Sequence, residues 1–149
     1  MQQLFMVVTV VVVGLMVGVE LSVAAFVNPG LGRLPDAACV AGRSDSARVL
    51  GRVMPFWYIL SVVLVGWWAV QSWGRAQALL VTVVAALLVV SVVLSVALLE
   101  PINARVARWT AQSVPADWQQ QVGKWDGLHY VRVGILVATF ILLVVAGTA

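Results

Sequence analysis

Five polar side chains interrupt otherwise apolar stretches of this 149-residue chain: Glu20, Glu100, Asn103, His129 and Arg132. Glutamate and histidine are common general bases, and histidine is also a common metal ligand. An ionisable group within a membrane segment is costly unless it is paired, and such groups often mark functional sites. We therefore expect Glu20, Asn103, His129 and Arg132 to be candidate catalytic residues.

The spacing of these residues predicts which of them meet. Trp125, His129 and Arg132 follow the pattern i, i+4, i+7, so they share one helical stripe and can line one cavity. Glu20 precedes Asn28 by eight residues, which places it roughly 12 Å inside that end of its helix. Arg132 lies about two turns inside its own helix. This comparable depth predicts a Glu20–Arg132 pair. The pair could be a structural clamp between helices, or Glu20 could have a catalytic role.

Four further residues near the same helix ends are candidate substrate contacts, namely Asn28, Glu100, Trp57 and Trp125. The tryptophans and Asn28 also have a simpler interpretation. The tryptophans can belong to the aromatic belt at a membrane interface. Asn28, like Asn103, lies next to a proline and can simply cap a helix end.

One histidine and one cysteine exclude a zinc site of histidine or thiolate ligands and a bis-histidine haem within one subunit. There is no glycine-rich phosphate loop and no nucleophile elbow. We predict no cofactor. Two alternatives stay open, a haem with His129 as its only axial ligand, and a single metal ion bound by His129 with Glu20 and Asn103. His129 could also bond a backbone carbonyl, and Cys39 reads as a small residue in a loop.

The composition identifies the solvent of the protein. Hydrophobic residues make up 62% of the chain and charged residues 10%, far from the balance of a soluble domain. We therefore predict an integral membrane protein whose partner is the lipid bilayer. The net charge of +3 is explained by membrane topology and anionic headgroups, so no nucleic-acid partner is expected.

The hydrophobic pattern predicts one all-α domain over residues 1–149, a bundle of four transmembrane helices. The spans are expected at about 4–27, 54–71, 78–99 and 127–146. Asn28-Pro29-Gly30 should end the first span. Two longer loops should lie on one membrane face and carry short amphipathic helices, one capped by Ser44-Asp45-Ser46 and one over Trp118–Trp125.

Basic residues predict the orientation. Eight lie on the side of the longer loops, and Arg75 alone lies opposite: Arg33, Arg43, Arg48, Arg52, Arg105, Arg108, Lys124 and Arg132. The positive-inside rule places the loops in the cytoplasm and both termini outside the inner or plasma membrane. Gly14, Gly18 and Ser22 form a small-residue stripe that predicts close helix packing, within the bundle or in a homo-oligomer.

Four motifs across nearly the whole chain carry a family resemblance. They are Asn28-Pro29-Gly30-Leu31 with Leu34-Pro35, then Met54-Pro55, then Pro101-Ile102-Asn103, and finally Trp125, His129 and Arg132 as W-x3-H-x2-R. With these motifs the chain resembles the anthrone oxygenase-like family of small four-helix membrane proteins. Many relatives carry asparagine where this chain has His129.

The resemblance implies oxidation of a flat aromatic, polyketide-type substrate by O2 near the cytoplasmic face, without haem or flavin. It implies that His129 or Glu20 is the base, that Arg132 and Asn103 hold the developing oxyanion, and that Trp125 stacks on the substrate. Two alternatives remain, a haem- or metal-dependent oxidase that uses His129, and a non-enzymatic bundle that binds a lipid or quinone or stabilises an assembly.

Overall fold

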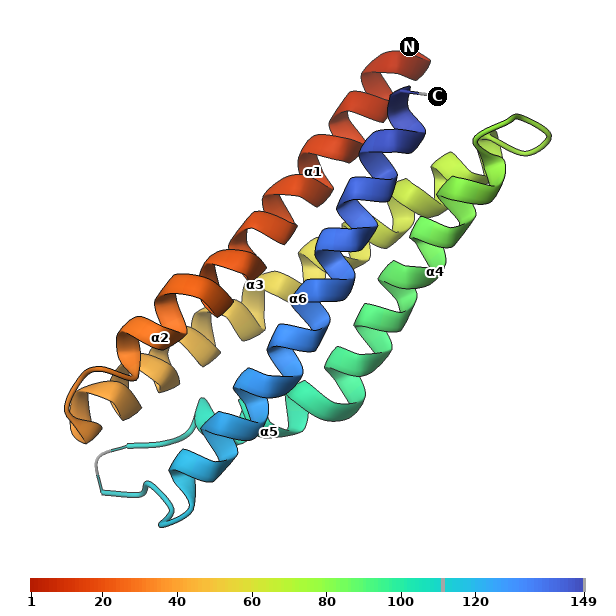
Figure 1. The fold of residues 1–149 in the computed structure, drawn as a ribbon. Coiled ribbons are helices and arrows are strands. Elements are labelled where there is room, and N and C mark those ends of the chain that lie inside the picture. Colours follow the sequence, from red (N-terminus) through yellow and green to blue (C-terminus); the bar gives the residue numbers. More distant parts are fainter. Residues whose placement is uncertain (111, 149) are drawn as a thin grey trace.

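Four long helical segments run side by side in the computed structural model, which describes residues 1–110 and 112–148 (Figure 1). Each segment is long and apolar enough to cross a membrane, and none of the described residues forms a strand. The all-α bundle of four membrane helices is therefore confirmed. The elements in order are α1 (Gln2–Ser22), the π-helix η1 (Val23–Val27), α2 (Asn28–Leu31), α3 (Asp36–Gln71), α4 (Ala78–Leu94), the π-helix η2 (Ser95–Leu99), α5 (Glu100–Val106) and α6 (Trp118–Thr148).

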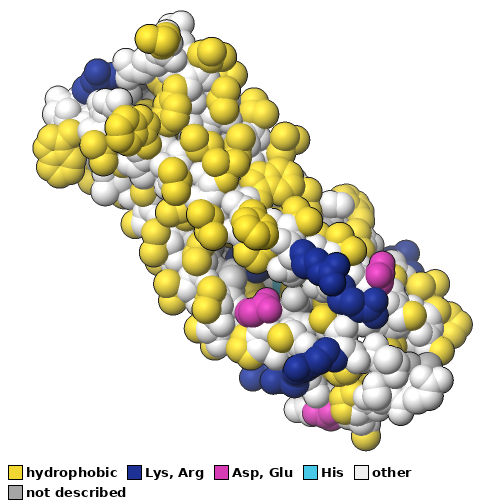
Figure 2. Space-filling view, turned by 180° about the vertical axis from the view of Figure 1, so that it is seen from behind, with side chains coloured by type: hydrophobic (Ala, Val, Ile, Leu, Met, Phe, Trp, Pro, Cys, Tyr) yellow, Lys and Arg dark blue, Asp and Glu magenta, His cyan; other side chains and the backbone are white. Residues whose placement is uncertain are grey.

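The helices are arranged so that α1 and α4 each pack against both α3 and α6. Both termini lie at one end of the bundle, together with the turn that joins α3 to α4 (Figure 1). The connections that follow α2 and α5 lie at the opposite end, which we call the loop end. Figure 2 shows hydrophobic side chains along most of one face and Lys and Arg gathered mainly toward one end.

Small and apolar side chains fill the interior between the helices, among them Val13, Leu88 and Leu136, which are fully buried. Lipid tails are as apolar as these side chains, so tight packing between helices stabilises the bundle. Gly14 contributes directly, because a Cβ atom there would lie 2.8 Å from the Phe140 ring on α6. Gly18 has no atom within 4 Å of such a Cβ position, so the predicted close packing is confirmed for Gly14 and not for Gly18.

Two prolines modify membrane helices without ending them. Pro29 and Pro101 lack an N–H, and their rings crowd the carbonyl four residues earlier. The helix widens before each of them into η1 and η2, where Asn28 N–H bonds to Val23 O and Glu100 N–H bonds to Ser95 O. The prediction that Asn28-Pro29-Gly30 stops the first helix is therefore wrong, since the helical path continues to Leu31.

The predicted loop helices are also different in the structure. α3 is continuous over Asp36–Gln71 and α6 over Trp118–Thr148, so the expected short helices are extensions of the second and fourth spans. Ser44 does not cap a helix; its hydroxyl donates to the carbonyl oxygens of Ala107 or Trp109. Cys39 is buried in α3 and does not lie in a loop.

Candidate active site

A cavity of about 560 Å³ lies between the helices in the half of the bundle nearer the loop end. This volume falls within the roughly 300–1,000 Å³ typical of small-molecule sites. Its wall is mainly apolar, with Leu50, Met54 and Val92 among the lining residues. The polar lining residues are Glu20, Asn28, Arg43, Ser46, Tyr58, Ser95, Glu100, Asn103, Trp125, His129 and Arg132.

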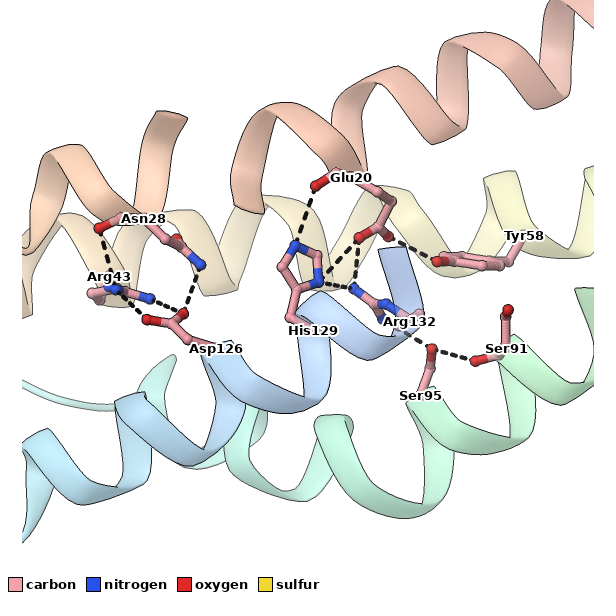
Figure 3. A network of polar contacts seen from close by, with 9 residues as sticks. All are labelled: Glu20, Asn28, Arg43, Tyr58, Ser91, Ser95, Asp126, His129 and Arg132. Atoms are coloured by element: carbon pink, nitrogen blue, oxygen red, sulfur yellow. Dashed lines mark hydrogen bonds and ion pairs between the residues drawn. The ribbon is translucent and has the colours of Figure 1, made fainter. Parts of the chain in front are cut away.

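A buried ion pair forms the centre of the polar wall (Figure 3). Arg132 Nη2 donates to Glu20 Oε2 at 2.6 Å, which confirms the predicted Glu20–Arg132 pair. The hydroxyl of Tyr58 on α3 donates to the other carboxylate oxygen at 3.0 Å. Arg132 Nη1 donates to the Ser95 hydroxyl at 2.9 Å. Side chains from α1, α3, η2 and α6 are therefore joined through one carboxylate and one guanidinium.

Both ring nitrogens of His129 are engaged in this network. Arg132, three residues later on the same helix face, places Nη2 2.9 Å from His129 Nδ1, and Glu20 Oε2 lies 3.4 Å from the same nitrogen. Because a guanidinium can only donate, Nδ1 must accept, and the hydrogen of a neutral ring then lies on Nε2. Nε2 donates to the backbone carbonyl of Glu20 at 3.2 Å. The interpretation that His129 bonds a backbone carbonyl is confirmed.

This engagement decides how well His129 suits a haem or a metal ion. Ligation needs a free lone pair on one ring nitrogen. The Nδ1 lone pair accepts from Arg132, while Nε2 carries the hydrogen donated to Glu20. Within residues 1–110 and 112–148, no group of three His, Cys, Asp or Glu side chains is arranged to hold a metal ion. In this arrangement His129 would have to give up its contact with Arg132 or with the Glu20 carbonyl before it could bind a haem or a metal ion.

A second polar network lies closer to the loop end. Arg43 binds Asp126 through two contacts, Nη1 to Oδ1 at 2.7 Å and Nη2 to Oδ2 at 2.8 Å. The Asn28 amide donates to the same carboxylate at 2.8 Å, and its backbone oxygen accepts from Arg43 at 3.3 Å. Two parallel bonds of this kind give a strong and well-oriented ion pair. The network joins α2, α3 and α6 at one end of the cavity (Figure 3).

Replacing Asp126 with asparagine is expected to lower the free energy of unfolding by about 2–3 kcal/mol, because Arg43 loses its counter-charge while it stays buried. Asp45→Asn is the matched control, since Asp45 pairs with Arg48 at 3.8 Å and both side chains are largely exposed. An exposed pair contributes about 0–1 kcal/mol. Unfolding of both variants in mixed micelles, followed by circular dichroism, measures the difference; equal losses would contradict the structural role of Asp126.

The remaining predicted residues are placed as follows. Asn103 lines the cavity, and its amide donates to Ala47 O at 3.4 Å; Glu100 lines it from an exposed position. Trp125 lines the cavity and stacks on His129, with ring centroids 4.6 Å apart. The structure does not bring Trp57 to the cavity, because its indole donates to Val12 O on α1.

The interpretation of Asn28 and Asn103 as helix caps is wrong. Asn28 is the first residue of α2 and Asn103 lies inside α5, and neither side chain bonds a free N–H at a helix start. Their amides donate instead to Asp126 and to Ala47 O in neighbouring helices. Both asparagines therefore connect elements, and both remain among the residues that line the cavity.

Three N–H groups of cavity-lining side chains have no hydrogen-bond partner among the described residues. They are Arg43 Nε, Trp125 Nε1 and Arg132 Nε. A buried donor without a partner costs about 1–3 kcal/mol, so a bound molecule that offers acceptors recovers this energy. These three N–H groups therefore favour a ligand with oxygen acceptors.

Sequence reasoning missed four residues of the two networks, namely Arg43, Tyr58, Ser95 and Asp126. Arg43 was considered only for its charge, and a single serine such as Ser95 in an apolar span is no signal of a site. Asp126 offered a signal, because it lies three residues before His129 and so shares its helix face. Tyr58 offered none, since a tyrosine in an apolar span is equally typical of lipid contact.

A family model described as anthrone oxygenase matches residues 46–142, which is more than half of the chain. The matched region contains Tyr58, Ser95, His129 and Arg132, whereas Glu20 lies before it. Neither the curated proteins nor the solved structures gave a match. From the extent of the family match, the chain belongs to the anthrone oxygenase family.

Proposed function

We propose that this protein is a cofactor-independent monooxygenase that oxidises a flat, anthrone-like aromatic molecule with O2 in the cavity. The observation that carries the proposal is the Glu20 carboxylate, 3% exposed, held by Arg132 and Tyr58 at the wall of a largely apolar cavity in a member of this family. A fixed base in a water-poor slot is what removal of a proton from an acidic C–H requires.

Glu20 is the better candidate for the base. A carboxylate offers about four lone-pair positions on its two oxygens. Arg132 and Tyr58 occupy one position each, which leaves capacity for a substrate proton. The corresponding lone pair of His129 already accepts from Arg132. His129 then acts as a positioning residue, since it holds the guanidinium on one side and the backbone of α1 on the other.

The proposed reaction starts with transfer of a proton from the methylene carbon between the rings to Glu20. The resulting enolate passes one electron to O2, and the two radicals combine to form a C–O bond and a peroxide anion, which takes the proton back from Glu20. Glu20 then removes the second methylene proton. The electron pair of that C–H bond forms the new carbonyl while the O–O bond breaks, and the hydroxide that leaves takes the proton from Glu20 to give water. Anthrone and O2 are thereby converted into anthraquinone and water, with both electron pairs accounted for.

The enolate oxygen needs donors in the cavity wall. Arg132 Nε and Trp125 Nε1 are free to donate to it, and the amide of Asn103 lines the same space. Donors fixed before the reaction stabilise developing charge without reorganisation, and one such donor can lower the activation free energy by about 2.7–4 kcal/mol. From the positive-inside rule we propose that this cavity lies near the cytoplasmic face and that both termini lie outside.

Oxygen uptake by the purified protein with a dihydroxyanthrone tests the proposal. We expect uptake above the spontaneous rate, with one O2 consumed per anthraquinone formed, and no requirement for added haem or metal. The product is quantified by its visible absorbance, and heat-denatured protein gives the background. Uptake equal to this background would overturn the assignment to an anthrone substrate.

Substituting His129 separates a base from a positioning residue. His129→Ala is expected to lower turnover roughly 10- to 100-fold, because Arg132 loses an acceptor and shifts. His129→Asn should recover most of this loss, since its side-chain oxygen can accept from Arg132 but cannot act as a base. Turnover numbers of the two variants are measured side by side. An asparagine variant as inactive as the alanine variant would assign proton transfer to His129.

A further inference from the structure

The cavity has a side opening between α3 and η2. α3 packs against α4 before this level and against α5 after it. η2 continues the helix of α4 into α5 and packs against α6, and among the described residues it has no comparable packing with α3. Its Ser95 hydroxyl is directed to Arg132 on α6. The widened π-helix before Pro101 thus leaves a gap in the wall, which we call the window.

The residues around the window are both part of the cavity lining and exposed. Ile59 and Val63 on α3 are 62% and 60% exposed, and Val96 on η2 is 66% exposed. All three are apolar, and Glu100 lies at the side nearer the loop end. Figure 2 shows a hollow in the middle of the face that it draws. His129 lies deep in the cavity, since it is one of the lining residues and is only 1% exposed.

The depth of the window places it within the apolar part of the bundle. Val96 precedes Glu100 by four residues, which is about 6 Å along the helix. Ile59 follows Arg52 by seven residues, or about 10 Å. Charged residues mark the headgroup level, so the window opens into the hydrocarbon layer just inside the headgroups at the loop end. A molecule dissolved in the bilayer can reach it without crossing water.

The loop end of the cavity is covered. The Arg43–Asp126 pair and Asn28 close one part of it. Beyond them, an apolar cluster packs the connection after α5 against α3 and α6; its buried members are Val40, Ala47, Ile102, Val106 and Trp109. A ligand arriving from this side would have to separate an ion pair and a packed cluster.

We infer that a planar, bilayer-dissolved ligand enters and leaves the cavity through the window between α3 and η2. This inference rests on the proposed function only in taking the cavity as the ligand site; it does not require that the ligand be oxidised. An apolar aromatic molecule passes the apolar side chains of Ile59, Val63 and Val96 on this route. It then reaches the polar part of the cavity wall, which includes Glu20, Trp125 and Arg132. The bilayer then serves as the reservoir for substrate and the sink for product.

The test uses full-length protein in phosphatidylcholine vesicles and a dihydroxyanthraquinone as the probe. Binding is followed by stopped-flow quenching of tryptophan fluorescence. Ile59→Phe with Val96→Phe narrows the window. Leu60→Phe with Leu98→Phe is the matched control, because these residues are 47% and 48% exposed on the same elements and do not line the cavity.

In the window variant we expect association and dissociation rates to fall together by at least tenfold, with the dissociation constant unchanged within twofold. The control variant should match the wild-type protein. Ile59→Ala with Val96→Ala should raise both rates. This variant tests the window as the entry route if the bulky variant fails to fold. Unchanged rates, a loss confined to one rate, or no binding to the wild-type protein would each overturn the inference.

Oxygen uptake on the anthrone, measured on the same samples, keeps the two proposals apart. If the protein takes up oxygen but the window substitutions leave the exchange rates of the probe unchanged, only the inference about the window is overturned. If the protein shows no oxygen uptake but the probe exchanges more slowly in the window variant, only the proposed oxygenase activity is overturned.

Discussion

Replacing Glu20 with glutamine is expected to reduce oxygen uptake on an anthrone by at least about 100-fold, the lower end of what a positioned general base contributes. The amide keeps nearly the same shape, and its oxygen can still accept from Tyr58 or Arg132. It cannot take the substrate proton. The measurement is the turnover number from initial rates of oxygen consumption, with bound probe confirming that the cavity still accepts ligand.

Glu20→Asp is the second variant in this experiment, because it keeps the charge opposite Arg132 but withdraws the carboxylate from the cavity. It should fold like the wild-type protein and lose activity, which separates catalysis from the stability of the ion pair. Thr139→Val provides a control elsewhere on α6, since Thr139 is buried and its hydroxyl donates to Ile135 O on the same helix. If Glu20→Gln kept a tenth or more of the activity, another group would be the base.

Replacing Arg132 with methionine is expected to cost about 3–5 kcal/mol of stability, because the Glu20 carboxylate would remain buried without its counter-charge. Ser95 and His129 would lose a hydrogen-bond partner in the same step. The double variant Glu20→Gln with Arg132→Met should recover most of this loss, because replacing both charges of a buried pair is often close to neutral. The free energies come from unfolding in mixed micelles.

The same double variant decides between a structural clamp and a catalytic pair. We expect it to be stable and inactive, since it lacks both the base and the guanidinium donor. Full activity in the double variant would mean that the pair acts only as a clamp. Losses of the two single variants that simply add in the double variant would show that Glu20 and Arg132 are not energetically coupled.

Much of the fold followed from the chain itself. Long apolar runs predict membrane helices because each span must satisfy its own backbone hydrogen bonds. The depth of Glu20 and Arg132 could be estimated because the rise per residue is fixed. Their pairing followed from the high cost of leaving either charge alone in an apolar interior. The helix ends were less predictable, since the helices accommodate Pro29 and Pro101 with a π-helical turn and continue past them.

The sequence by itself therefore determined the solvent, the four spans, the Glu20–Arg132 pair and the stripe of Trp125, His129 and Arg132. Only the tertiary structure decided that Tyr58 and Ser95 complete the network, that Arg43 pairs with Asp126, and that η2 leaves a window beside α3. The physical reason is that local spacing fixes which side chains share one helix face. Contacts between helices depend on their rotation and relative shift, which the packing of all four helices sets together.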